Sequence, residues 1–278
     1  MAFDVTFWGV RGTVPCPSRD HVEVGGNTSC VEVSVGGRTL ILDGGTGLRP
    51  LGKKLVERGG GRLTILMSHF HLDHIAGFPF FAPAFCPDFT IDVRAACPAG
   101  KADLCAVLSG QMEPPLFPVP LRDLEAAITF EQFRPGDRLD LGDGVAVRTA
   151  SLNHPAGCTG FRIEHGGHAL AYVTDTEHVP GRPDENVLGL IRDADLVIYD
   201  AAYTDEEWDR RRGWGHSTWR EGIRLCRMAG ARRLALFHHD PDHDDAFMAR
   251  LELEAKAEWP AAFVAREGVT VGLGAGVG

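Results

Sequence analysis

Four potential metal ligands lie within six residues of the segment SHFHLDHIAGF: His69, His71, Asp73 and His74. The run RLTILM directly before them is apolar and β-branched, so it predicts a buried strand that ends at the first histidine. In an extended loop, His69 and His71 point to the same side and can therefore hold one ion. Asp73 and His74 come where the chain is expected to turn into a helix, so they point elsewhere and are candidates for a second ion.

Each ion needs further ligands, because a catalytic Zn²⁺ takes about three protein ligands and keeps an open position. Other His and Asp residues directly follow predicted strands: His154 after VAVRTASLN, Asp175 after HALAYVT, Asp200 after ADLVIY and His238 after RRLALF. A rigid sheet aims the side chains at its strand ends toward one place. We therefore expect His154 to complete the first ion and His238 the second, with the two oxygens of Asp175 bridging the pair.

Three positions carry alternatives. His239 competes with His238 as a ligand, and His238 is favoured because it ends the apolar run. Asp43 follows the run TLIL and precedes two glycines, so it suits either a carboxylate that orients a ligand histidine or a turn former. For the histidine-rich segment as a whole, the alternative is a helix N-terminus capped by Asp73 with surface histidines.

Predicted strands and helices that position these residues occur in both halves of the chain. The first half contains the strand-like segments DVTFWGV, SCVEVSV and RTLILD, followed by the helical pattern LRPLGKKLVERGG. The second half contains TGFRIEH and the four strands named above, the helical segments STWREGIRLCRMAG and AFMARLELEAKAEW, and AAFVAREGVTVGL, which suggests a hairpin. This order predicts an α/β sandwich of two sheets with helices outside. We expect one domain over residues 1–278, with a cap-like insertion at about 77–144 that is rich in aromatic residues and proline.

Composition limits the classes of partner. The 278 residues are 44% hydrophobic and 24% charged, as in a soluble globular protein, and no apolar stretch is long enough for a membrane span. The net charge of −10 argues against extended nucleic-acid binding but permits a small anionic substrate at a local positive site. Seven cysteines without a CxxC pair, and no visible signal peptide, favour a cytoplasmic protein with reduced thiols. The oligomeric state is left open, with a homodimer as one compatible arrangement.

The segment HFHLDH resembles the signature of the metallo-β-lactamase superfamily of binuclear hydrolases. LNHPAGCTGFRIE, with His154, and YVTDTE, with Asp175, resemble its later ligand motifs in order and spacing. The resemblance covers essentially the whole chain. It implies an αβ/βα four-layer sandwich with two mixed sheets and helices outside. It also implies two divalent metal ions at one edge between the sheets, with Zn expected and Mn, Fe or Ni as alternatives.

GWGHST, residues 213–218, resembles the His-Ser-Thr motif of the phosphodiesterase branch of this superfamily, which contains tRNA 3′-processing endonucleases and small cyclic phosphodiesterases. The N-terminal segments WGVRGTVPCP, GGNTSCVEV and LILDGGTG resemble a bacterial group labelled cyclic-nucleotide-phosphodiesterase-like. The branch implies that His216 acts on the leaving oxygen as a general acid or cationic stabiliser. Asp200 then bonds its other ring nitrogen and keeps the ring protonated. Asp73 joins these two as a candidate catalytic residue while also serving as a ligand.

These features predict a metal-dependent hydrolase, specifically a phosphodiesterase that acts on small, cyclic-nucleotide-like phosphodiesters by attack of a metal-bridged hydroxide. A nuclease acting on RNA 3′ ends is an alternative, although the 21 positions from His154 to Asp175 leave no room for a long tRNA-gripping arm. A carboxylic ester or lactone hydrolase is another, although NHPAGCTG departs from the PGHTxG pattern of those relatives. An iron-binding redox or sensor protein is a further alternative, disfavoured because the chain shows no flavin domain and no carboxylate-richer ligation.

Overall fold

The structure is a computed structural model that describes residues 3–97 and 103–274. Within these residues the strands form two seven-stranded sheets, ordered β14-β1-β2-β3-β4-β5-β6 and β13-β12-β11-β10-β9-β8-β7. The first sheet contains β1 (Phe3–Gly9), β2 (Cys30–Val35), β3 (Arg38–Leu42), β4 (Gly61–Met67), β5 (Phe89–Ala96), β6 (Ala127–Phe133) and β14 (Thr270–Gly272). The second contains β7 (Arg138–Gly142), β8 (Val145–Leu152), β9 (Cys158–His165), β10 (His168–Val173), β11 (Leu196–Asp200), β12 (Leu234–Phe237) and β13 (Ala262–Val264).

The two sheets pack face to face across the main hydrophobic core. In β1 the alternating apolar residues Phe3, Val5 and Phe7 are buried, as expected for a strand with one face on a core. The Phe7 ring lies 6.2 Å from the ring of Phe237 in β12, which in turn lies 5.8 Å from that of Tyr172 in β10. Side chains of both sheets therefore belong to one packed cluster.

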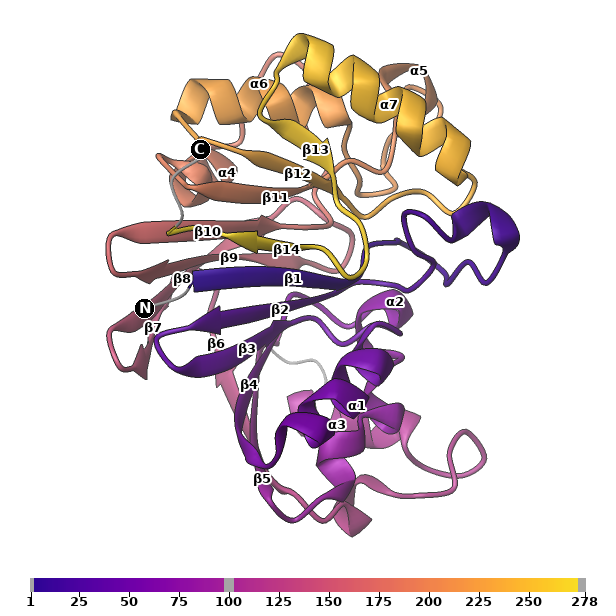
Figure 1. Cartoon of the computed structure of the whole chain (residues 1–278), viewed down its shortest axis with the longest axis vertical. Helices are drawn as coiled ribbons and strands as arrows, with labels where there is room; N and C mark the ends of the chain where they lie inside the picture. Colours follow the sequence, from indigo (N-terminus) through magenta and orange to yellow (C-terminus); the bar gives the residue numbers. More distant parts are fainter. Residues whose placement is uncertain (1–2, 98–102, 275–278) are drawn as a thin grey trace.

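Helices cover the outer faces of both sheets (Figure 1). They are α1 (Leu48–Arg58), α2 (Leu72–Ile75), α3 (Leu104–Gln111), α4 (Glu185–Ile191), α5 (Asp205–Trp208), α6 (Trp219–Ala229) and α7 (Asp245–Glu258), with 3-10 helices at Arg19–His21, Phe78–Phe80, Ala82–Phe85 and Leu121–Asp123. In the figure α1 and α3 lie beside the first sheet, and α4, α6 and α7 lie beside the second. The predicted four-layer α/β sandwich is thus confirmed. Over the described residues, none of these helices has the length and apolar character needed to cross a membrane.

Parallel pairing brings the carboxyl ends of many strands to the same edge. β3, β4, β5 and β6 are paired in parallel in the first sheet, and β10, β11, β12 and β13 in the second. β8 also runs in the direction of β10, because β9 is antiparallel to both. The residues that follow β3, β4, β8, β10, β11 and β12 are therefore placed to form one site.

Two expectations about local structure were wrong. The segment AAFVAREGVTVGL is not a hairpin, because β13 pairs with β12 in the second sheet and β14 pairs with β1 in the first. The segment at about 77–144, expected as a cap-like insertion, is not one throughout, because β5 and β6 extend the first sheet and β7 joins the second. These strands lie between stretches rich in aromatic residues and proline, which concealed them. That residues 1–278 form one domain stays a prediction.

Candidate metal centre

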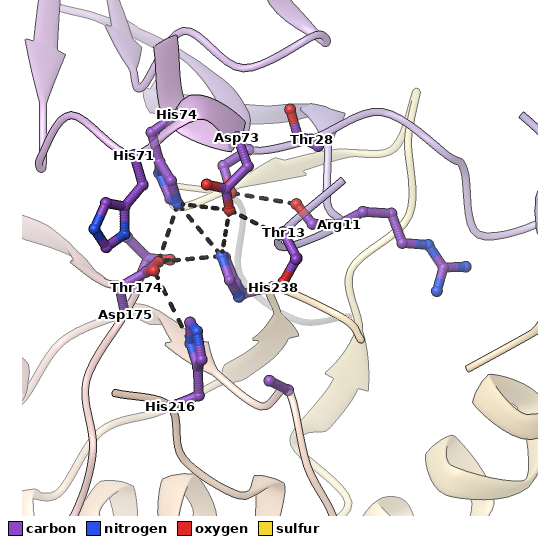
Figure 2. Close-up of polar contacts among 12 residues, drawn as sticks. Arg11, Thr13, Thr28, His71, Asp73, His74, Thr174, Asp175, His216 and His238 are labelled. Atoms are coloured by element: carbon purple, nitrogen blue, oxygen red, sulfur yellow. Dashed lines mark hydrogen bonds and ion pairs between the residues drawn. The ribbon is translucent and has the colours of Figure 1, made fainter. Parts of the chain in front are cut away.

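The seven residues expected to bind metal come together where strands of both sheets end. Figure 2 shows five of them: His71, Asp73, His74, Asp175 and His238. The first sheet and its helix α2 supply His69, His71, Asp73 and His74. The second sheet supplies His154 after β8, Asp175 after β10 and His238 after β12. The figure shows Asp73 and His74 facing Asp175 and His238 across a short gap. Groups that are distant in sequence thus converge because the two sheets face each other.

The seven side chains form two groups of four donors whose donor atoms lie within 4.8 Å of one another, and a third such group joins Asp175 and His238 to Asp200 and His216. One group consists of His69, His71, His154 and Asp175, and the other of Asp73, His74, Asp175 and His238. Asp175 belongs to both groups. The grouping of these side chains is the one expected from the sequence, including the shared carboxylate, and their role as metal ligands stays a prediction.

Asp175 presents a different oxygen to each group. Its Oδ2 lies 3.6 Å from Nε2 of His69 and 3.6 Å from Nε2 of His154. Its Oδ1 lies 3.1 Å from Nε2 of His74 and 3.2 Å from Nε2 of His238. A carboxylate placed in this way suits a bridge between two cations.

Partners outside the cluster fix the ligand rings. His74 Nδ1 donates to Oδ2 of Asp43 at 2.7 Å, and His154 Nδ1 donates to the carbonyl of Gly215 at 2.8 Å. Each bond turns the other ring nitrogen, Nε2, toward the cluster, which is the usual arrangement around a metal-ligating histidine. Within the described part of the chain, the buried Nε2 of His69 has no hydrogen-bond partner. These rings therefore fit a divalent metal.

The buried cluster carries an excess of negative charge. Burial alone would raise the pKa of Asp73, but His74 and His238 outweigh burial and hold that pKa well below its usual range. Burial lowers the pKa of His74, but nearby carboxylates, chiefly that of Asp175, raise it well above the usual value. In the metal-free protein, protons on His74 therefore neutralise part of the carboxylate charge. A metal cation can take their place, which couples metal binding to proton release.

Asp43 is the main support of this cluster from the first sheet. Its Oδ2 accepts hydrogen bonds from His74 Nδ1, from the hydroxyl of Ser68 at 2.8 Å and from the hydroxyl of Tyr172 at 2.8 Å, and its Oδ1 accepts from the backbone N–H of Ser68 at 2.6 Å. The residue is fully buried and has a positive φ of 60°. Of the two alternatives for Asp43, the geometry favours the carboxylate that orients a ligand.

His216 lies beside the donor groups and is paired with Asp200, as expected. Its Nδ1 donates to Oδ2 of Asp200 at 2.9 Å, and the same nitrogen lies 3.9 Å from Asp175. Burial lowers the pKa of His216, but the Asp200 carboxylate outweighs burial and raises it to about 9. Thr218 caps α6 through a bond from the Glu221 N–H, so the motif serves both the helix start and the site.

His239 does not enter either donor group. It is buried, and its Nε2 faces the carbonyl of Ala265 at 3.0 Å. His238, which has a positive φ of 59°, is the histidine that faces the cluster.

The backbone N–H of Thr13 donates to Oδ2 of Asp73 at 2.8 Å. Sequence reasoning missed this contact, because almost every residue has a backbone N–H and the residue type does not show which one will donate.

A cleft of about 770 Å³ opens onto both donor groups. Its lining includes His71, Asp73, His154, Asp175 and His216. Pockets of roughly 300–1,000 Å³ hold small molecules. Most of the cluster is buried behind this opening, whereas His71 is exposed at it.

A family model described as a beta-lactamase superfamily domain matches residues 38–239, which is more than half of the chain. The chain belongs to the β-lactamase superfamily. The fold and the order of the ligand motifs agree with its metallo-β-lactamase members, and the protein is a metal-dependent hydrolase of this superfamily. Divalent metal use follows from the family together with the His and Asp clusters.

The chain is also similar to named proteins and solved structures. The chain is 28% identical to a protein of Salinibacter ruber named Ribonuclease Z, over 96% of this chain and 93% of the relative. Among solved structures, it is similar to the metallo-beta-lactamase fold protein YhfI from Bacillus subtilis, with a TM-score of 0.73, 21% identity and coverage of 98% and 99%. It is also similar to the short form of human tRNase Z, with a TM-score of 0.68, 20% identity and coverage of 96% and 98%. The two structures show the same fold.

Proposed function

We propose that this protein is a phosphodiesterase that uses two divalent metal ions and acts on small phosphodiesters. One observation carries the proposal: two donor groups share Asp175, and the His216–Asp200 pair lies next to them. We assign one ion to His69, His71, His154 and Asp175, and the other to Asp73, His74, Asp175 and His238. Imidazole and carboxylate donors suit Zn²⁺, and they also accept Mn²⁺, Fe²⁺ or Ni²⁺.

When bound, such ions supply Lewis acidity that lowers the pKa of water and offsets negative charge on phosphoryl oxygens. The chain's own residues have three tasks. Asp43 and the carbonyl of Gly215 hold ligand rings in place. The N–H of Thr13 holds Asp73. Asp200 orients His216 and stabilises its protonated form, so that the ring can give a proton to the leaving oxygen or stabilise its charge.

The charge of the molecule and the size of the cleft support a small substrate. With a net charge of −10, the chain lacks the overall positive charge that favours long nucleic acids. The cleft of about 770 Å³ is of the size that suits a nucleotide-sized ligand. Two cationic groups line it: the His216 ring, whose pKa Asp200 raises to about 9, and Arg211, which is paired to Asp240 at 2.7 Å.

A nuclease acting on RNA 3′ ends is the second candidate. It is favoured by relatives named Ribonuclease Z, for example proteins of Haloarcula marismortui and Salinibacter ruber that match 86% and 96% of this chain. In this alternative the active site is the same, and the substrate is a much larger phosphodiester. The two candidates therefore differ in what lies outside the cleft.

The proposal is tested with purified protein loaded with Zn²⁺ or Mn²⁺. We expect hydrolysis of bis-p-nitrophenyl phosphate. On a cyclic phosphodiester whose leaving oxygen is an alkoxide and needs a proton, His216→Ala should lose about 10²–10⁴-fold, the usual range for a general acid. His165→Ala, at the opposite end of β9, is the matched control and should keep full activity. Turnover of a carboxylic ester or a lactone without any phosphodiester turnover would show that the proposal is wrong.

A second assay separates the two candidates. A precursor tRNA with a 3′ extension is compared with a small cyclic phosphodiester at several salt concentrations. Cleavage of the RNA with much higher kcat/KM and a steep salt dependence would favour the nuclease. A preference for the small substrate with little salt dependence is expected here.

A further inference from the structure

The catalytic cleft has an apolar rim. Trp214 is 62% exposed, Leu72 is 72% exposed and Val14 is 48% exposed, and all three line the cleft that opens onto the donor groups. They come from three separate segments: the loop after β1, the start of α2 and the loop before α6. Large apolar side chains gathered at an opening that leads to a reactive site are characteristic of ligand recognition.

The loop that carries Trp214 is held in one conformation. The carboxylate of Glu177 accepts hydrogen bonds from the N–H of Gly213 at 2.8 and 2.9 Å and from the N–H of Gly215 at 2.8 Å. Both glycines have positive φ, 86° and 88°. The carbonyl of Gly215 also accepts the bond from His154. An exposed indole on a backbone fixed from both sides loses little entropy when a ligand contacts it.

Polar groups beside the rim suit a ring that also carries hydrogen-bond donors. The guanidinium of Arg211 lies 4.7 Å from the centre of the Tyr203 ring and is paired with Asp240. The side chain of Asp242 is exposed, and all four of these residues line the cleft. The Asp242 carboxylate at this rim can accept a hydrogen bond from the amino group of a base, whereas that of Asp240 is already paired with Arg211.

We propose that Trp214 is the stacking platform for a nucleobase, and that the substrates are phosphodiesters with a base close to the scissile phosphate. The inference rests on the proposed phosphodiesterase function and names its substrate class. Stacking on an aromatic side chain tolerates every base, because each base has a π-face. Trp214 and His216 line the same cleft, so a base held by Trp214 lies in the opening that leads to the reacting group.

The first test uses a matched pair of substrates, adenosine 2′,3′-cyclic phosphate and the base-free glycerol 1,2-cyclic phosphate, followed by ³¹P NMR. Trp214→Ala is expected to lower kcat/KM for the adenosine substrate by about 5- to 150-fold, mainly through KM, as for loss of one stacked base. Glycerol cyclic phosphate should change by less than about two-fold, because Trp214 touches no part of it. Trp214→Phe should retain most of the activity, and Leu253→Ala, which removes an exposed apolar side chain on α7, is the control.

An equal loss on both substrates would mean that Trp214 supports the loop rather than the base, and no loss on either would exclude stacking. Both results overturn the inference. A wild-type enzyme that hydrolyses neither substrate would instead count against the proposed function. In that case calorimetry with zinc-loaded protein compares adenosine monophosphate with ribose 5-phosphate. Tighter binding of the nucleotide that disappears in Trp214→Ala supports the stacking site, and equal affinities overturn it.

Discussion

Replacing Asp43 by asparagine tests a residue that orients a metal ligand without binding metal itself. Asp43 binds no metal in our assignment, yet its carboxylate holds the ring of His74. Asparagine keeps the shape of the side chain and tolerates the positive φ of 60°. The substitution therefore changes hydrogen bonding and charge while it preserves the backbone.

The expected magnitude follows from the four bonds that Asp43 accepts. An asparagine oxygen in place of Oδ2 can keep the bonds from His74, Ser68 Oγ and Tyr172, but its amide group then faces the N–H of Ser68. Leaving that buried N–H unpaired costs about 1–3 kcal/mol. For a chain of this size, that corresponds to a fall in Tm of about 2–12 °C. Loss of the carboxylate partner of a ligand histidine typically weakens metal binding by about 10–100-fold.

The measurements are thermal unfolding of the metal-free protein and a zinc titration against a chelator of known affinity. Asp143→Asn is the matched control, because Asp143 also has a positive φ, 53°, but lies on the surface, with its side chain 62% exposed and paired to Arg38. The control should leave both readouts unchanged. If Asp43→Asn bound zinc as tightly as the wild type, the orienting role of Asp43 would be refuted.

Three further predictions concern the surroundings of the site. Gly215→Ala should lower phosphodiester hydrolysis by about 100-fold with an unchanged circular dichroism spectrum, because its Cβ would lie 2.3 Å from His154 Nδ1; full activity would contradict this. His239→Ala should keep the wild-type metal content by atomic absorption, since its ring faces a backbone carbonyl, and a lost ion would show that it is a ligand. Burial raises the pKa of Glu207, but the bond from His243 outweighs burial and lowers it. Its stabilising contribution is therefore complete above the ordinary carboxyl pKa of 4.5 and is lost as the pH falls through the lower folded value. In urea, the free energies of unfolding of Glu207→Gln and the wild type should differ at neutral pH and converge in acid. A difference that stays constant with pH would show that the bond between Glu207 and His243 does not stabilise the fold.

Much of the donor arrangement could be predicted because strand ends and ligand types coincide in the sequence. An apolar run followed by His or Asp locates both the end of a buried strand and a side chain at the sheet edge, as for His69 and Asp175. His238 was preferred to His239 because it directly follows the apolar run of the predicted strand. The structure brings His238 to the cluster and directs His239 to a carbonyl.

The features that the sequence did not indicate depend on contacts between segments that are far apart in the chain. β13 and β14 are short, and each pairs with the nearest open strand edge, which lies in a different sheet for each. The carboxylate of Glu177 binds a loop that begins 36 residues later, and a contact over this distance cannot be predicted from a local sequence pattern. Trp214 in GWGHST was visible as a residue type, but its exposure at the cleft becomes apparent only with the fold.

The position of the donors ties metal binding to the packing of the two sheets. His69 and His74 come from the side of the first sheet, whereas His154, Asp175 and His238 come from the second. Each donor group therefore contains residues from both sides, and each proposed ion connects the two halves of the sandwich. Because the unfolded chain cannot assemble these donors, binding free energy adds to folding free energy. The buried carboxylates oppose closure of the metal-free site, and protons on the histidines only partly compensate for them. The same charge excess that attracts divalent cations to the site thus makes metal a structural partner of the fold.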